Sequence, residues 1–203
     1  MRYLSGARNP VMLDDLATGR IGLLQTPRTR YRLEGVAVWA MDNGCFTDTY
    51  PGDDEYIATL SKYDEHKDRC LFVAVPDVVG DAGATLGNWP RMAPRIKAAG
   101  WPVALVLQDG MTPDSIPWAE VDWVFVGGSD DFKLGPDAER LILEAKKRDI
   151  KVHVGRVNSH KRYRKFAALG CDSADGTFIA FAPMKNHKSV LRWLDSHVEM
   201  RMF

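Results

Sequence analysis

The chain has 203 residues, with 27 Lys and Arg against 27 Asp and Glu, so its formal net charge is zero when histidine is neutral. Hydrophobic residues make up 45% of the chain, a globular composition that excludes a disordered or fibrous protein. The neutral balance excludes a global attraction to nucleic acid, so any such binding needs a local basic patch. The length suits one domain, residues 1–203, built around one core.

Membrane insertion and export are not expected. No apolar run approaches the roughly 20 residues of a membrane-spanning helix, and the N-terminus lacks the apolar segment of a signal peptide. Cys45, Cys70 and Cys171 are odd in number and widely spaced, which favours a reducing compartment over a disulfide framework. We therefore expect a cytoplasmic protein with no membrane partner, no metal site and no cofactor.

Apolar runs alternate with amphipathic stretches along the whole chain. The predicted strands are 36–41, 71–76, 102–107, 123–126 and 151–154, with weaker candidates at 2–4 and 173–178. The predicted helices are 53–62, 88–99, 136–148, 159–169 and 185–198, and no clear helix follows the strand at 102–107. Residues 6–32 show too little periodicity to place a strand, and Asp130-Asp131 fit a solvated loop. This alternation predicts a parallel sheet covered by helices.

Two α/β architectures fit that pattern: a closed (β/α)8 TIM-like barrel and an open doubly wound sheet. The chain lies near the lower limit of about 200 residues for such a barrel, so its length alone suits the open sheet better. Periodicity and composition leave both architectures open.

Polar residues and glycines follow the predicted strands, at the edge where both architectures place their active sites. They are Asp42, Asn43, Gly44, Asp77, Gln108, Asp109, Gly110, Gly127, Gly128, Ser129, Gly155, Arg156, Asp172, Asp175 and Gly176. Asp and Gly after a strand are also ordinary turn residues. Gln108, however, ends a strongly apolar strand, and a buried amide needs hydrogen-bond partners that a ligand could supply. The pattern predicts a site for a small polar ligand.

The order of these motifs carries a family resemblance. The stretches concerned are Asp42-Asn43-Gly44-Cys45-Phe46, Asp77, Val106-Leu107-Gln108-Asp109-Gly110, Val126-Gly127-Gly128 and Gly170-Cys171-Asp172-Ser173-Ala174-Asp175. In this order they resemble the queuine-type guanine transglycosylases, the tRNA-guanine transglycosylase-like barrel enzymes that exchange guanine in nucleic acid for a 7-deazaguanine. The tail after Phe178 lacks the cysteines of that family's zinc site, so the chain is most similar to the small phage and bacterial relatives that modify DNA.

The resemblance implies a compact TIM-like barrel that works as a DNA guanine transglycosylase. The partners would be DNA, or tRNA as the nearest alternative, and a 7-deazaguanine base as the small substrate. Asp175 falls on the nucleophile that forms a covalent glycosyl intermediate, and Asp42 takes the general acid–base role. Base exchange inside a duplex would also require the target base to flip out of the stack.

The resemblance also assigns the residues that bind the base. They are Asp77, Gln108, Gly127, Gly128, Asn43 and Asp172. Asp77 would accept hydrogen bonds from the donor edge of a purine, while Gln108 and the backbone N–H groups of both glycines would hold the O6 side. Asp172 is the competing candidate for the nucleophile, or it supports the loop that carries Asp175. Three carboxylates in one pocket repel, so at least one pKa should rise.

A dense basic cluster starts directly after the sixth strand and predicts contacts with the phosphates of nucleic acid. Its members are Arg156, His160, Lys161, Arg162, Arg164, Lys165 and, nearer the C-terminus, Lys188. A solvated helix face explains such a run equally well, and Arg156 is equally suited to an ion pair with Asp175 or Asp172.

Two other functions stay open. One is a small barrel enzyme for a phosphorylated metabolite, with Gly127-Gly128-Ser129 as its phosphate cradle. The other is a barrel that binds a deazapurine or a DNA end without turnover. His153, inside a predicted strand, fits a satisfied core histidine better than a ligand-binding one.

Overall fold

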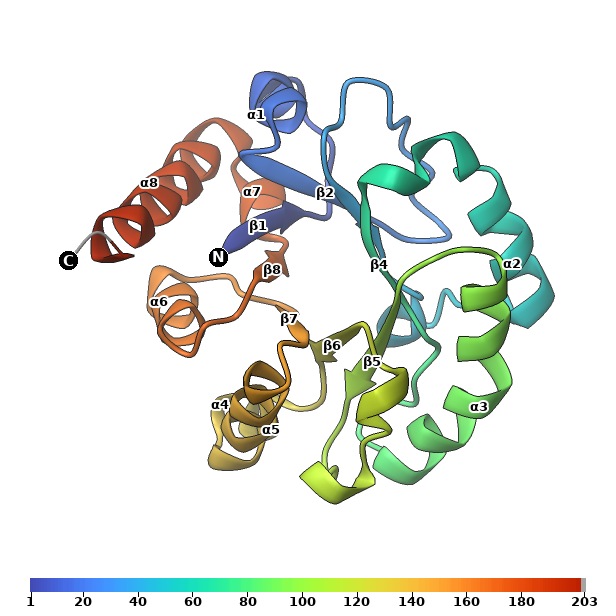
Figure 1. Ribbon diagram of the computed structural model, residues 1–203. Coiled ribbons are helices and arrows are strands. Elements are labelled where there is room, and N and C mark those ends of the chain that lie inside the picture. The colour runs from blue at the N-terminus through green and yellow to red at the C-terminus, as the bar shows by residue number, and fades with distance from the viewer. Residues whose placement is uncertain (202–203) are drawn as a thin grey trace.

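Eight short parallel strands close into a barrel with helices around it (Figure 1). The computed structural model describes residues 1–201, and side chains to residue 196. The strands are β1 (Arg2–Ser5), β2 (Ile21–Gln25), β3 (Trp39–Met41), β4 (Cys70–Ala74), β5 (Val103–Leu107), β6 (Trp123–Val126), β7 (Lys151–Val154) and β8 (Ser173–Gly176). They lie in chain order, and β8 closes against β1 with Leu4 opposite Asp175. The TIM-like barrel is therefore confirmed, and the open sheet is excluded.

The helices cover the outer surface of the barrel. They are α1 (Leu13–Thr18), α2 (Asp53–Ser61), α3 (Ala82–Ala98), α4 (Asp130–Leu134), α5 (Pro136–Lys147), α6 (His160–Ala168), α7 (Phe178–Phe181) and α8 (Pro183–Arg201). Helix α3 starts six residues before its predicted start, because the Asp81 carboxylate caps it by accepting the N–H of Ala84 at 2.9 Å. Among the described residues, no helix combines the length and apolarity needed to cross a membrane.

One stretch that periodicity left unassigned contains a strand, and one predicted loop is a helix. The aperiodic stretch after β1 contains β2, all five residues of which are buried, so it lacks the alternation that marks a half-exposed strand. Asp130-Asp131 form the first turn of α4, because the Ser129 hydroxyl accepts the N–H of Phe132 at 3.1 Å and caps that helix. The acids suit the positive end of the helix dipole.

Apolar side chains fill the barrel in two layers. The inner layer is a compact cluster of Leu4, Leu24, Ala40, Phe72, Ala74, Ala104, Val106 and Phe125. The outer layer lies between the strands and the helices. The barrel is thus a packed core and not a pore, and a ligand can enter only at its ends.

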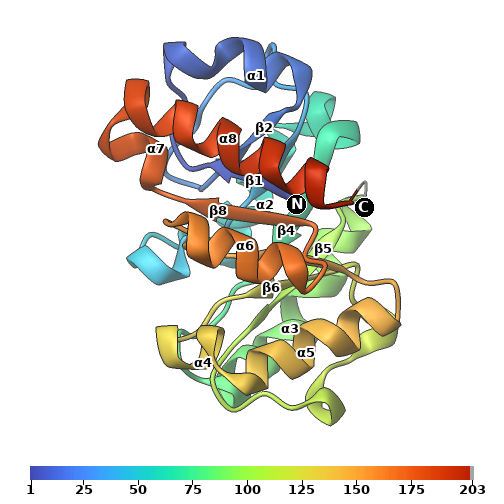
Figure 2. The same ribbon diagram turned by 90° about the vertical axis from the view of Figure 1, so that its left-hand side faces the viewer.

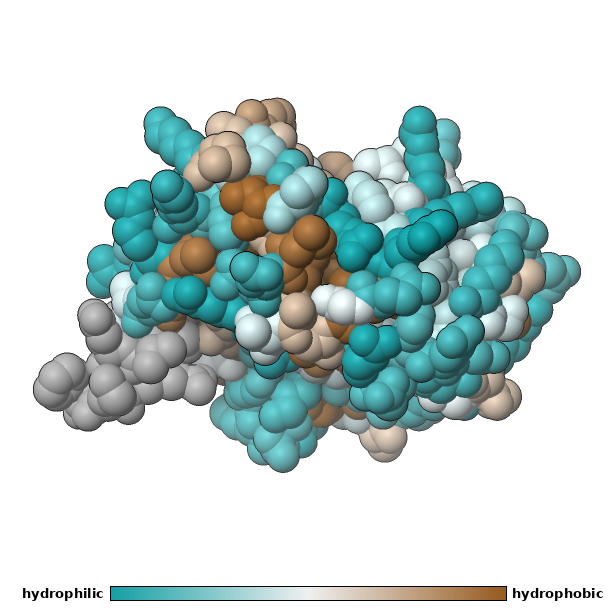
Figure 3. Space-filling view, turned by 90° about the horizontal axis from the view of Figure 1, so that it is seen from above, coloured by the Kyte–Doolittle hydropathy of each residue, from teal (hydrophilic) through white to brown (hydrophobic). Residues whose placement is uncertain are grey.

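Helix α8 runs along the outside, beside α6 and close to α1 (Figure 2). Figure 3 looks onto the end of the molecule where α1 lies, and apolar side chains gather there among hydrophilic ones. Exposed large apolar residues include Leu13 on α1, Phe181 on α7 and Met184 on α8.

Candidate functional site

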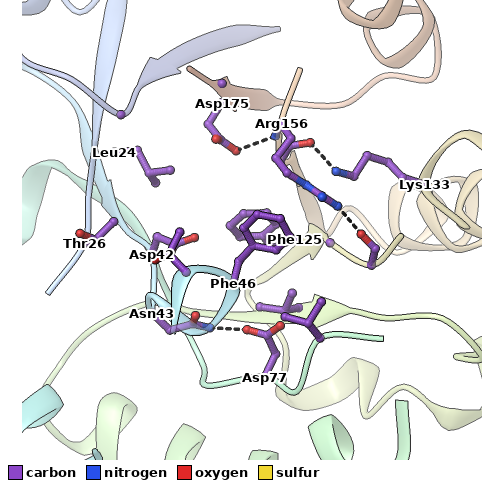
Figure 4. Close-up of a pocket in the computed structure, with 18 of the residues that line it drawn as sticks. Leu24, Thr26, Asp42, Asn43, Phe46, Asp77, Phe125, Lys133, Arg156 and Asp175 are labelled. Atoms are coloured by element: carbon purple, nitrogen blue, oxygen red, sulfur yellow. Dashed lines mark hydrogen bonds between the residues drawn. The ribbon is translucent and has the colours of Figure 1, made fainter. Parts of the chain in front are cut away.

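A cavity of about 390 Å³ opens at the carboxyl ends of the strands, a size suited to a small organic ligand. Its apolar lining consists of Leu24, Phe46, Val79, Val106 and Phe125. Its polar lining includes Thr26, Asp42, Asn43, Asp77, Gln108, Lys133, Arg156, Asn158, Asp175 and Thr177. Figure 4 shows Asp42, Asp77 and Asp175 on different sides of the cavity, with the rings of Phe46 and Phe125 between them.

The carboxylate of Asp77 is fixed by two amides. Asn43 Nδ2 donates to Asp77 Oδ1 at 2.8 Å, and Gln108 Nε2 donates to Oδ2 at 2.6 Å. Gln108 is held in turn, because its Oε1 accepts the N–H of Gly80 at 2.9 Å. Burial raises the pKa of Asp77, and the two amide hydrogen bonds oppose that rise. A carboxylate has about four lone-pair positions, so Asp77 keeps acceptor capacity for adjacent N–H groups of a ligand.

Asp42 follows β3 and has a proton affinity suited to acid–base work. Its Oδ1 accepts the N–H of Gly44 at 2.7 Å. Burial, with smaller contributions from the charges of Asp175 and Asp77, raises its pKa to about 7 although the Gly44 hydrogen bond opposes the rise. A carboxyl that titrates near neutral pH can both give and take a proton. The expected pKa rise among the three carboxylates therefore falls mainly on Asp42.

Asp175 is held from two directions in β8. His153 Nε2 lies 3.1 Å from its Oδ1, and the backbone N–H of Arg156 donates to the same oxygen at 3.3 Å. His153 Nδ1 lies 2.8 Å from the hydroxyl of Ser173. The histidine is fully buried and hydrogen-bonded, as its interpretation as a satisfied core residue expected. That interpretation missed its partner, which is the carboxylate proposed as the nucleophile.

Lys133 was not predicted, and it pairs with Arg156 in a crossed arrangement. Lys133, on α4, donates from Nζ to the carbonyl oxygen of Gly155 at 2.8 Å. Arg156, which follows Gly155, donates back from its guanidinium to the carbonyl oxygen of Gly128. Each cation thus holds the loop that carries the other. Arg156 has a positive φ of 61°, and its guanidinium lies 4.4 Å from the ring centre of Phe46.

Asp172 does not belong to the site, so its assignment to substrate binding is wrong. It precedes β8 and lies at the opposite, amino-terminal end of the barrel. Its Oδ2 accepts from Lys146 Nζ at 2.7 Å and from the N–H of Val152 at 2.8 Å. Asp172 therefore ties β8 to β7 and α5.

The two glycines line the cavity, but the expected N–H donors are only partly free. The N–H of Gly127 donates to the carbonyl oxygen of Leu107 at 3.1 Å, so it cannot bind a ligand oxygen as predicted. The phosphate cradle at Gly127-Gly128-Ser129 is also wrong, because Ser129 donates its N–H and its hydroxyl to Asp109 at 2.8 and 2.5 Å. The two donors of Ser129 that a phosphate would need at that place are therefore occupied.

The basic cluster lies mostly outside the cavity, and only Arg156 lines it. Arg162 pairs with Asp130 at 2.7 Å, Lys165 donates to the carbonyl oxygen of Leu134 at 2.5 Å, and His160 stacks on Trp193. Lys161, Arg164 and Lys188 are exposed on the outer helices. Much of the cluster thus makes structural contacts around α6. In the described part of the chain, no group of three or more His, Cys, Asp or Glu is placed to hold a metal ion, and the side chain of His197 lies outside that part.

Comparison with known proteins identifies the fold and no family. No family model matches the chain, and no curated protein matches it. The 3-hexulose-6-phosphate synthase of Salmonella typhimurium superimposes with a TM-score of 0.59 at 16% identity, over 97% of this chain and 99% of its own. A tryptophan synthase chain from M. tuberculosis superimposes with a TM-score of 0.58 at 13% identity, and the match covers 97% of this chain and 91% of the synthase chain. The YdjI aldolase of Escherichia coli K12 superimposes with a TM-score of 0.58 at 12% identity, and the match covers 99% of this chain and 87% of the aldolase.

The interpretation as a DNA guanine transglycosylase is wrong. These similar structures span nearly the whole chain and are named as two synthases and an aldolase, not as enzymes of nucleic acid. Two of the basic side chains expected to contact DNA, Arg162 and Lys165, bind groups of the α4 segment. The resemblance to queuine-type transglycosylases stays a prediction from motif order.

Proposed function

We propose that this chain is an enzyme for a small metabolite that carries a planar heterocycle of the purine or deazapurine type. The reaction is cleavage or exchange of the bond between the heterocycle and its sugar. The observation that carries the proposal is the Asp77 carboxylate, fixed by Asn43 and Gln108 at 2.8 and 2.6 Å in a cavity that also holds Asp42 and Asp175.

The heterocycle would be recognised by its edge and by its faces. Its adjacent N–H groups would donate to the free lone pairs of Asp77, which two amides already orient. Its faces would contact the aromatic and aliphatic walls supplied by Phe46, Phe125 and Leu24. This combination favours a flat ring with neighbouring donors, such as guanine or 7-deazaguanine, over adenine, which lacks the paired donor edge.

The chemistry would divide between the other two carboxylates. Asp175 attacks the anomeric carbon of the sugar, and the carbon–nitrogen bond breaks with its electron pair passing to the heterocycle. Asp42, protonated, gives its proton to the leaving nitrogen. Water or a second heterocycle then attacks the glycosyl ester, loses its proton to Asp42 and frees Asp175.

The test is base release and base exchange with guanosine and guanosine monophosphate. Chromatography would follow the free base and incorporation of labelled guanine, and mass spectrometry of acid-quenched protein would detect the glycosyl ester. Asp175→Asn should abolish all three signals, because the amide is a poor nucleophile. Asp172→Asn is the matched control, since this carboxylate binds Lys146 at the far end of the barrel. Folded wild type with no release, exchange or adduct would refute the proposal, as would full activity of Asp175→Asn.

A further inference from the structure

Two cations line the cavity with their charged groups on backbone carbonyl oxygens, while the nearest carboxylates act on them only from beyond ion-pair distance, Asp175 and Asp130 on Lys133 and Asp109 and Asp130 on Arg156. The side chains of Lys133 and Arg156 hold backbone carbonyl oxygens, those of Gly155 and Gly128. Within the described residues, neither charged group forms an ion pair at 4.0 Å or less, whereas the neighbouring Arg162 pairs with Asp130. Lys133 is almost fully buried, with 1% of its surface exposed.

This arrangement is costly unless an anion completes it. A carbonyl oxygen satisfies a hydrogen bond but does not neutralise a full charge, and a buried cation that has no carboxylate within ion-pair distance is incompletely neutralised. Lys133 and Arg156 also repel one another, and burial together with the Arg156 charge lowers the pKa of Lys133 to about 8. Each side chain uses one hydrogen-bond donor on a carbonyl and keeps others free.

We propose that Lys133 and Arg156, the cationic clamp, bind the phosphate group of the ligand. The inference rests on the proposed function and narrows its substrate class to a phosphate ester of the nucleotide type. The clamp joins the loops after β6 and β7, while Asp77 follows β4, and Figure 4 shows them on different sides of the cavity. One elongated ligand would therefore place its heterocycle on Asp77 and its phosphate on the clamp.

The shape and charge of the clamp favour phosphate. Arginine offers a planar fork of donors and lysine a compact charge, a combination suited to several oxygens of one dianion. Asn158 and Thr177, from the loops after β7 and β8, also line the cavity and add neutral polar groups. Barrel enzymes often build phosphate sites from the loops after their last strands.

Ribose 5-phosphate and ribose are the probes, compared by titration calorimetry at low ionic strength. Wild type should bind ribose 5-phosphate more tightly than ribose. Lys133→Met and Arg156→Met should each weaken ribose 5-phosphate binding by roughly 10- to 100-fold, as expected for a hydrogen bond to a charged group. Lys165→Met is the matched control, because Lys165 also holds a carbonyl oxygen, that of Leu134, but outside the cavity. The Lys165→Met variant should bind ribose 5-phosphate with the affinity of wild type.

A second measurement on the wild type needs no variant. Lys133 faces the charges of Arg156, Arg162, Asp175 and Asp130, and a bound phosphate would raise the pKa of Lys133 from about 8. Binding near pH 8 should then take up protons, seen as a heat that depends on the buffer. Equal affinity of the Met variants and wild type, equal binding of ribose and its phosphate, or no proton uptake would each overturn the clamp assignment.

The same titrations separate the two proposals. Asp77→Asn should lose guanine binding and keep ribose 5-phosphate binding. Clamp-dependent phosphate binding without any guanine binding would refute the proposed heterocycle and retain the clamp. Guanine binding that depends on Asp77, with no effect of the clamp variants on ribose 5-phosphate binding, would refute the clamp and retain the proposed heterocycle.

Discussion

His153 and Asp175 meet inside the barrel, with Nε2 of the histidine 3.1 Å from Oδ1 of the carboxylate. The histidine packs between the rings of Phe72 and Phe125, whose centres lie 4.9 and 4.5 Å away. The Ser173 hydroxyl, 2.8 Å from Nδ1, completes a chain from serine through histidine to the carboxylate. If Ser173 donates to Nδ1, the neutral histidine carries its proton on Nε2 and donates it to Asp175. The chain then sets the direction in which Asp175 faces the cavity.

His153 is therefore predicted to be a positioning residue. His153→Ala should lower the free energy of unfolding by about 2–5 kcal/mol, because it leaves a cavity between two aromatic rings. It should also lower kcat for base release by about tenfold or more, with a smaller change in KM, because Asp175 loses its donor. His153→Gln, whose amide N–H can occupy the place of Nε2, should recover much of kcat. If the Gln variant is as slow as the Ala variant, the histidine acts through packing alone.

Asp42 should make stability depend on pH in one direction. Its pKa is about 7 in the folded protein against the ordinary value of 3.8, so between these values the folded state binds more protons than the unfolded state. Stability contributed by this group is present below about pH 4 and is lost as pH rises towards 7. Asp42→Asn should flatten that part of the profile, measured as urea midpoints from pH 4 to pH 8. Activity should fall above about pH 7, as the acid loses its proton. Parallel profiles of variant and wild type would contradict the raised pKa.

Asp172→Ala tests whether Asp172 has a structural role at the amino-terminal end of the barrel and no role in ligand binding. Removing this carboxylate leaves Lys146 and the N–H of Val152 without their partner, so the free energy of unfolding should fall by about 1–3 kcal/mol. Guanine and ribose 5-phosphate affinities, measured well below the unfolding temperature, should not change. A variant of normal stability that binds either ligand more weakly would return Asp172 to the site.

The sequence contained enough information to separate Asp172 from Asp175. Side chains alternate between the two faces of a strand, so residues three apart face opposite ways. Asp175 lies within β8 and reaches the cavity, while Asp172 precedes the strand at its other end. The repeat of strand and helix likewise predicted the strands other than β2, because continuous apolar runs are the strongest local signal, but it did not decide between a closed barrel and an open sheet.

Other features of the site depend on contacts that no local pattern contains. Lys133 lies in a helix that begins at Asp130 and was expected to be a loop, so nothing marked its side chain as buried. The Gly127 N–H is used because β5 and β6 continue their hydrogen bonding one residue past the strand. Charge alone also could not show that Arg162 and Lys165 hold the α4 segment. Which polar groups stay free is decided by tertiary packing.

Gly155 is predicted to be essential for the shape of the cavity. A Cβ atom there would lie 2.6 Å from Cε2 of Phe125 and 3.4 Å from Oδ1 of Asp175. The ring cannot retreat freely, because it packs on the buried His153 with ring centres 4.5 Å apart. Gly155→Ala should therefore lower the free energy of unfolding by about 1–3 kcal/mol, and it should weaken guanine binding by moving the aromatic wall.

Gly87→Ala is the matched control for that substitution. Gly87 lies inside α3, and a Cβ atom there would meet nothing within 4 Å. Because alanine favours a helix interior, the free energy of unfolding of the variant should rise by about 0.5–1 kcal/mol. The variant should bind guanine as wild type does. Urea unfolding and calorimetric titration of the two variants side by side would measure both effects. If Gly155→Ala matches wild type in stability and affinity, the Phe125 ring has room to move, and the wall it forms does not define the ligand site.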